Sequence, residues 1–336
     1  MSILRKKKIK MKYCIVIVVC LFQTLSLIGQ TFSSQDPEYI DNVKAGEAYL
    51  LAAQYDSCVM YYTMAFEIKQ TSFLSLMRGA ACAHSNGKDD LTDQWMSKAY
   101  ANSWEGAKGI FDNYPEFDYL RETEFSQMVD GRFNAAAEAS GIDLELRSEF
   151  DSILVYDQKW RLLMRDTSDI YGWDSPQMAA LWEHQNHWDS LNTLRIEEVI
   201  AEYGGYPGRS LVGNSHASTA FLVIQHAPLE TQVKYIDMMK EAADAEEVRW
   251  SSIALLIDRV NLGLGKKQIY GSQLARNEQT GDYYFSPMEN PYKIDSIRAT
   301  IGLGSLQDYA DNWEFTFNVE EHLEIWAEME QEEEKD

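Results

Sequence analysis

Residues 257–273 gather side chains that are capable of acid–base or binding chemistry. Asp258 and Arg259 end an apolar run, a glycine-containing break follows at 263–265, and Gln268, Tyr270 and Gln273 come next. A helix that only builds a core rarely needs an acid, a guanidinium, two amides and a phenol so close together. The group therefore indicates either a site or a buried polar brace.

Polar residues elsewhere in the chain extend this candidate site. Asp157 and Arg161 are four residues apart and share a helical face, for which a surface ion pair is the simplest interpretation. Gln225 and His226 close an apolar segment just before Pro228, where a histidine is either a core residue bonded to a carbonyl or a general base. We predict one cleft with His226 and Asp258 as catalytic candidates and the following binding residues: Asp157, Arg161, Gln225, Arg259, Gln268, Tyr270 and Gln273.

Three functions fit such a cleft. The leading one is binding of a polar ligand, with Arg259 holding an anion and the glutamine amides holding hydroxyls or amides. The alternative is an envelope hydrolase for a peptide or glycan bond, with His226 as acid or base and Asp258 as its orienter. The third is a structural network that ties a hairpin to helices. The sequence contains no Gly-x-Ser-x-Gly motif.

No metal ion or cofactor is expected from local spacing. His184 and His187 lie three residues apart beside Glu183, but the His-Glu-x-x-His order is absent and no further ligands stand at a defined spacing. The glycines near residue 204 and at 213 are better interpreted as helix punctuation than as a nucleotide-binding loop.

Hydrophobic periodicity predicts a mostly α-helical domain with a small β-hairpin over residues 144–317. Ser175 and Pro176 are typical of a helix start, and Tyr203-Gly204 of a helix stop. The predicted helices are 144–164, 175–203, 216–227, 229–245 and 249–262, and strands at 268–274 and 283–285 complete the hairpin. An acidic helical tail, 318–336, follows, with Leu323 and Trp326 packing back.

Residues 38–135 resemble tetratricopeptide repeats. Gly46, Tyr49, Tyr62 and Ala65 recur 34 residues later as Ala80, Ala83, Met96 and Ala99. Gly46 would let two helices approach closely, and residues 104–133 would cap the repeats. Such repeats predict either docking onto the rest of the chain or a protein or peptide partner.

Cys58 and Cys82 are the two cysteines beyond residue 30. The repeat pattern places them at neighbouring ends of antiparallel helices, so a disulfide is geometrically feasible. Two separate small core residues are the favoured interpretation, because free cysteine commonly packs in that way.

The N-terminus predicts export from the cytoplasm. Six basic residues precede an apolar run from Cys14 to Ile28, which is the pattern of a signal peptide over 1–30 and is short for a membrane anchor. The chain carries a net charge of −23; removing those six positive charges leaves −29. This acidity argues against nucleic acid as a partner. We expect a secreted, periplasmic or envelope protein without stable membrane insertion after cleavage.

The C-terminal half carries a set of motifs spread along the chain: Asp157-Gln158, Arg161, Asn192, Tyr203-Gly204, Pro207, Val212-Gly213, Gln225-His226-Ala227, Leu256, Asp258-Arg259, Gly265, Gln268, Tyr270-Gly271-Ser272-Gln273, Arg298 and Ile301-Gly302-Leu303. With these motifs, about residues 145–310 resemble an uncharacterised bacterial family, number 6624 among the domains of unknown function. The family more often has threonine at Ser272 and an acidic residue at Pro228. The resemblance implies no particular reaction.

Overall fold

The computed structural model describes residues 36–277 and 281–333. These residues form two compact units. The N-terminal unit comprises residues 36–154 and 207–217, and the C-terminal unit comprises 155–206 and 218–333. The predicted signal peptide lies outside the described residues. In the part of the chain that the structure describes, no helix combines the length and the hydropathy needed to cross a membrane.

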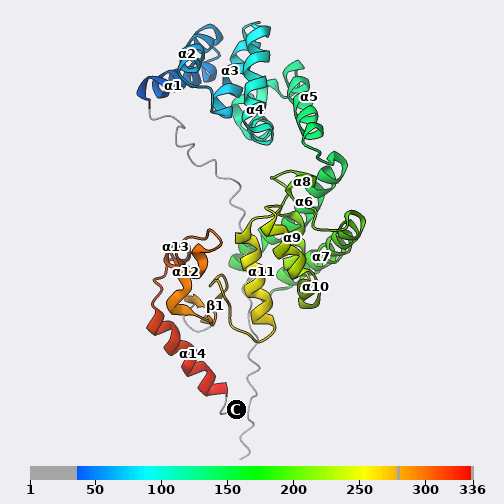
Figure 1. Cartoon of the computed structure of the whole chain (residues 1–336), viewed down its shortest axis with the longest axis vertical. Helices are drawn as coiled ribbons and strands as arrows, with labels where there is room; N and C mark the ends of the chain where they lie inside the picture. Colours follow the sequence, from blue (N-terminus) through cyan, green and yellow to red (C-terminus); the bar gives the residue numbers. More distant parts are fainter. Residues whose placement is uncertain (1–35, 278–280, 334–336) are drawn as a thin grey trace, which may run out of the picture. The chain divides into compact units, whose positions relative to one another are not determined.

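The N-terminal unit is built from successive helices (Figure 1). They are α1 Pro37–Leu51, α2 Tyr55–Ile68, α3 Phe73–Ser85, α4 Asp89–Asn113, the 3-10 helix η1 Pro115–Leu120, α5 Glu124–Ala139, the first part of α6 Leu144–Tyr171, and the short α8 Arg209–Val212. The close approach predicted for Gly46 is confirmed, because a Cβ there would lie 2.8 Å from the Tyr62 ring.

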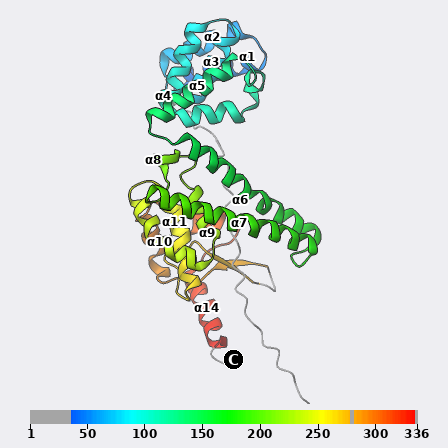
Figure 2. The same cartoon turned by 90° about the vertical axis from the view of Figure 1, so that its right-hand side faces the viewer.

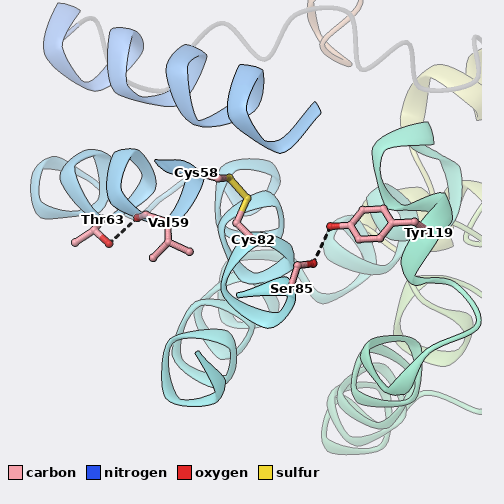
Figure 3. Close-up of a disulfide and its surroundings, with 6 residues drawn as sticks. All are labelled: Cys58, Val59, Thr63, Cys82, Ser85 and Tyr119. Atoms are coloured by element: carbon pink, nitrogen blue, oxygen red, sulfur yellow. Dashed lines mark hydrogen bonds between the residues drawn. A yellow bond between two sulfur atoms is a disulfide. The ribbon is translucent and has the colours of Figure 1, made fainter. Parts of the chain in front are cut away.

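A disulfide joins α2 to α3 (Figure 3). Cys58 and Cys82 lie at adjacent helix ends with their Cα atoms 6.0 Å apart. The preference for two separate core cysteines was therefore wrong, since both sulfurs are buried and face each other across the helix pair. The two cysteines are 24 residues apart in the sequence, and the disulfide lowers the conformational entropy of the unfolded chain. This stabilises the fold by about 3–4 kcal/mol.

The C-terminal unit is mostly α-helical, as predicted. Its elements are the rest of α6, α7 Pro176–Tyr203, α9 Thr219–His226, α10 Leu229–Asp244, α11 Trp250–Gly263, β1 Leu274–Arg276, β2 Tyr283–Phe285, η2 Pro291–Lys293, α12 Ile294–Ala299, α13 Leu306–Asp311 and α14 Val319–Glu333. The predicted limits of α7 are confirmed: the Ser175 hydroxyl accepts the Met178 N–H at 3.2 Å, and Gly204 ends the helix at φ 74°.

A small core forms around the hairpin. β1 and β2 are antiparallel, with Leu274 opposite Phe285. Phe285 packs in the core with Ile294 and Leu306 from the following helices. The Trp326 indole of α14 donates to the Phe285 carbonyl at 2.9 Å, as expected of a tail that packs back, whereas Leu323 stays 39% exposed.

Candidate functional site

A buried polar cluster lies where α6, α7 and the end of α9 meet. We call the side chains of Asp157, Arg161, Gln185, Asp189 and His226 the Asp157 cluster. Asp157 and Arg161 occupy adjacent turns of α6, and Gln185 and Asp189 occupy adjacent turns of α7, which runs alongside α6 (Figure 2). The four-residue spacing on each helix aims both pairs at the same seam.

Arg161 pairs with both carboxylates of the cluster. Its Nη2 donates to Asp189 Oδ2 at 2.7 Å, and its Nη1 lies 3.3 Å from Asp157 Oδ1 and also donates to the Asp157 carbonyl. The side chains of Arg161 and Asp157 are 3% and 1% exposed. The interpretation as a surface ion pair was therefore wrong, because α7 and α9 cover this face of α6.

His226 completes the cluster from the C-terminal end of α9. Its Nδ1 lies 3.1 Å from Asp157 Oδ1, so this carboxylate orients the imidazole. Burial lowers the pKa of His226 below its ordinary value, and the hydrogen bond to Asp157 opposes that shift. The imidazole is therefore neutral at pH 7, with a lone pair available to a proton or a cation.

The cluster contains buried polar atoms that lack a partner. The fully buried Gln185 uses Nε2 to donate to Asp189 Oδ1 at 2.7 Å and to the Asp157 carbonyl at 3.1 Å. Among the described residues, neither Gln185 Oε1 nor Arg161 Nε has a hydrogen-bond partner. Native proteins rarely leave such atoms unpaired, so a water, an ion or a polar ligand fits here.

Aromatic side chains form a second layer on the same two helices. Tyr156 stacks on Trp188 with 3.8 Å between ring centroids, and Trp160 stacks on His184 at 4.6 Å. His184 therefore lies in an exposed aromatic stack. This position does not favour the metal-binding role that was considered because His184 and His187 are three residues apart.

Asp258 organises a different cluster. Its carboxylate accepts the backbone N–H groups of Ile269, Tyr270 and Ser272 at 2.7, 3.0 and 2.9 Å, and the Ser272 hydroxyl at 2.8 Å. Burial raises the pKa of Asp258, and these hydrogen bonds oppose the shift. The predicted strand at 268–274 was wrong over most of its length, because N–H groups captured by Asp258 are not available to a sheet.

The glutamines beside Asp258 act as backbone braces. Gln268 donates to the carbonyls of Gln273 and Ser286 at 3.1 and 2.6 Å, and Gln273 donates to the Leu255 carbonyl at 3.2 Å. The Tyr270 carbonyl accepts from Arg298 at 2.8 Å. These contacts fix the path of residues 268–273 on the end of α11.

The predicted single cleft divides into two clusters. Asp157, Arg161 and His226 come together in one, whereas Asp258, Gln268, Tyr270 and Gln273 form the other. Arg259 donates to the Gln225 carbonyl at 3.0 Å, which ties α11 to the end of α9. No hydrogen bond joins His226 to Asp258 within residues 36–277 and 281–333; Asp157 occupies the orienting position.

Sequence reasoning missed Gln185 and Asp189. Both lie on the helix that was correctly predicted to begin at Pro176, and they repeat the four-residue spacing of Asp157 and Arg161. That matched spacing on two neighbouring helices was the available signal.

A further carboxylate missed by sequence reasoning lies in the N-terminal unit. Glu105 accepts from Arg147 Nη1 at 2.8 Å, from the Asn214 N–H at 2.9 Å and from the Ser215 hydroxyl at 2.9 Å. It borders a hollow of about 260 Å³ that Trp104 and Arg209 also line. With these donors on it, Glu105 serves to fasten the 207–217 segment to α4.

Residues 145–320 match a family model described as a family of unknown function, DUF6624. The chain belongs to this family. The resemblance predicted from the dispersed motifs is confirmed, and the match covers the Asp157 cluster and the Asp258 cluster together. No curated protein and no solved structure matches the chain.

Proposed function

We propose that this DUF6624 protein is an exported protein that binds a small polar ligand at the Asp157 cluster. The observation that carries the proposal is the unpartnered Gln185 Oε1, fully buried beside two carboxylates and an imidazole. The cluster is not sealed, because the Asp189 side chain is 16% exposed and that of His226 is 6% exposed. A ligand could therefore reach these groups from solvent.

A purely structural brace is a weaker explanation of the Asp157 cluster. The Asp258 cluster shows what a brace looks like, since each of its carboxylate oxygens is saturated by donors. Leaving a buried polar atom unsatisfied costs about 1–3 kcal/mol. In the Asp157 cluster, Gln185 Oε1 and Arg161 Nε are buried and unsatisfied. A bound ligand would remove this cost by supplying the missing hydrogen-bond partners.

We further propose that the helices of residues 38–135 are tetratricopeptide-like and act as a scaffold for a protein or peptide partner. Met60, Met64 and Ile68 lie four residues apart on α2 and are all exposed. An apolar stripe of this kind, rich in flexible methionine, suits a partner helix or an extended peptide. The predicted signal peptide supports a partner outside the cytoplasm.

Ligand binding can be tested with one pair of variants of the full chain. Gln185→Met keeps the side-chain volume but removes the amide, and Gln177→Met makes the same change at an exposed position of α7. Short peptides, muropeptides and divalent cations are screened singly by thermal shift and calorimetry. A solute that binds the wild type should bind Gln177→Met with the same affinity. It should bind Gln185→Met at least about tenfold more weakly, because that variant loses one buried hydrogen bond to the solute. The absence of any binding, or equal binding by both variants, would refute the proposal.

A hydrolase is the second candidate, because His226 and Asp157 form an oriented pair. Asp157 Oδ1 fixes the imidazole through Nδ1, which leaves Nε2 for a substrate or an attacking water, the arrangement of a general base. Asp157 thereby takes the orienting role that was predicted for Asp258. The peptide or glycan substrate expected for an envelope enzyme stays a proposal.

The pKa of His226 provides a direct check of this pair. In chelator-treated protein, titration by NMR should place the pKa of His226 below 6.5, and Asp157→Asn should lower it further by removing the stabilising carboxylate. Because the unfolded chain binds this proton more readily, His226 contributes stability above about pH 6.5 that is lost as the pH falls towards its folded pKa. An ordinary pKa in both proteins would show that Asp157 does not control His226.

A further inference from the structure

The Asp157 cluster has the composition of a metal site. One ligand atom from each of Asp157, Asp189 and His226 lies within 4.8 Å of the others. The fully buried amide of Gln185 is hydrogen-bonded to Asp189 and leaves its own oxygen unpartnered. The cluster thus offers four metal-ligating groups from three different helices: two carboxylates, an imidazole and an amide oxygen.

The separations in the cluster match a coordination sphere. Ligands of a first-row dication lie about 2.0–2.2 Å from the ion, and neighbouring ligands therefore lie about 3 Å from each other. His226 Nδ1 and Asp157 Oδ1 are 3.1 Å apart, and coordination through Nδ1 places the imidazole proton on Nε2. Gln185 Nε2 is 2.7 Å from Asp189 Oδ1, so a flip of this amide brings its oxygen to the same position. A small rearrangement would suffice to place an ion between them.

The charge balance also leaves room for a cation. Asp157 and Asp189 contribute two carboxylates and Arg161 contributes a single guanidinium, so the carboxylates outnumber the cation that pairs with them. Arg161 makes its long contact, 3.3 Å, to Asp157 Oδ1. An incoming ion could replace that contact while Arg161 keeps its bonds to Asp189 Oδ2 and to the Asp157 carbonyl.

We propose that the Asp157 cluster binds a transition-metal dication, Zn²⁺ or Mn²⁺, through Asp157, Asp189, His226 and the Gln185 amide oxygen. The inference rests on the proposed ligand-binding function and names the ligand. A mixed nitrogen and oxygen donor set suits these ions better than Ca²⁺ or Mg²⁺, which prefer oxygen alone. The sequence predicted no metal because the ligands share no local spacing.

Calorimetry with the chelator-stripped full chain tests the proposal. The wild type should bind one equivalent of Zn²⁺ or Mn²⁺, with Mg²⁺ binding much more weakly. Asp189→Asn and His226→Gln should each weaken binding at least about tenfold. His187→Gln is the matched control, because it removes an exposed histidine of α7 and should leave the affinity unchanged.

A measurement on the wild type avoids dependence on variant folding. Crystals soaked in Zn²⁺ should give an anomalous diffraction peak between Asp157, Asp189 and His226. Binding that survives Asp189→Asn and His226→Gln, or an anomalous peak elsewhere alone, would overturn the metal site. If peptides or muropeptides bind in a Gln185-dependent manner while Zn²⁺ and Mn²⁺ do not, the metal proposal fails and ligand binding stands. If nothing binds, both fail.

Discussion

Replacing Asp258 with alanine should lower the free energy of unfolding by about 3–5 kcal/mol. The substitution leaves the N–H groups of Ile269, Tyr270 and Ser272 without their acceptor at a position that is 0% exposed, and it also leaves a cavity. The backbone of 268–273 loses its attachment to α11. Urea unfolding followed by circular dichroism would measure the loss.

Asp308→Ala is the matched control for this prediction. Asp308 is an exposed carboxylate that accepts one backbone N–H, from Ser305 at 3.1 Å, in a helix capping box. Its loss should cost about 1 kcal/mol. If Asp258→Ala costs no more than Asp308→Ala, the loop holds its own conformation and Asp258 is free for another role.

Arg161→Met should be comparably destabilising in metal-free protein, by about 3–5 kcal/mol. Methionine fills much of the space but leaves the buried Asp157 and the partly buried Asp189 close together without their cation. Both carboxylates then lose their charge partner, and Asp189 also loses the hydrogen bond from Arg161 Nη2. Thermal and urea unfolding of the chelator-treated variant would report this loss.

Arg195→Met provides the surface reference for Arg161. Arg195 pairs with Glu198 at 3.2 Å on the solvent-facing side of α7, and such pairs contribute about 0–1 kcal/mol. If the cluster accepts a dication, Zn²⁺ should restore part of the stability of Arg161→Met and none of that of an Asp189→Asn, Arg161→Met double variant. A loss from Arg161→Met that is as small as that from Arg195→Met would mean that the carboxylates are solvated.

Helix limits were largely readable from the chain because their causes are local. Ser175 caps α7, Pro176 opens it and Gly204 closes it in the left-handed conformation, each within one turn. The hairpin was less predictable. Residues 268–273 alternate as a strand would, but Asp258, ten or more residues earlier, captures their N–H groups and leaves strands of three residues each.

The sequence by itself determined the helical class, the family and the sharing of a face by Asp157 and Arg161, because periodicity and four-residue spacing act within one helix. The tertiary structure alone decided that this face is buried and that Asp189 and His226 join it. These partners are 28 residues from Arg161 and 69 from Asp157, respectively. Which helix covers which depends on packing of the whole unit, and no local spacing encodes it. For the same reason, the tertiary structure separated Asp258 from His226 and brought Asp157, Asp189 and His226 together among α6, α7 and α9.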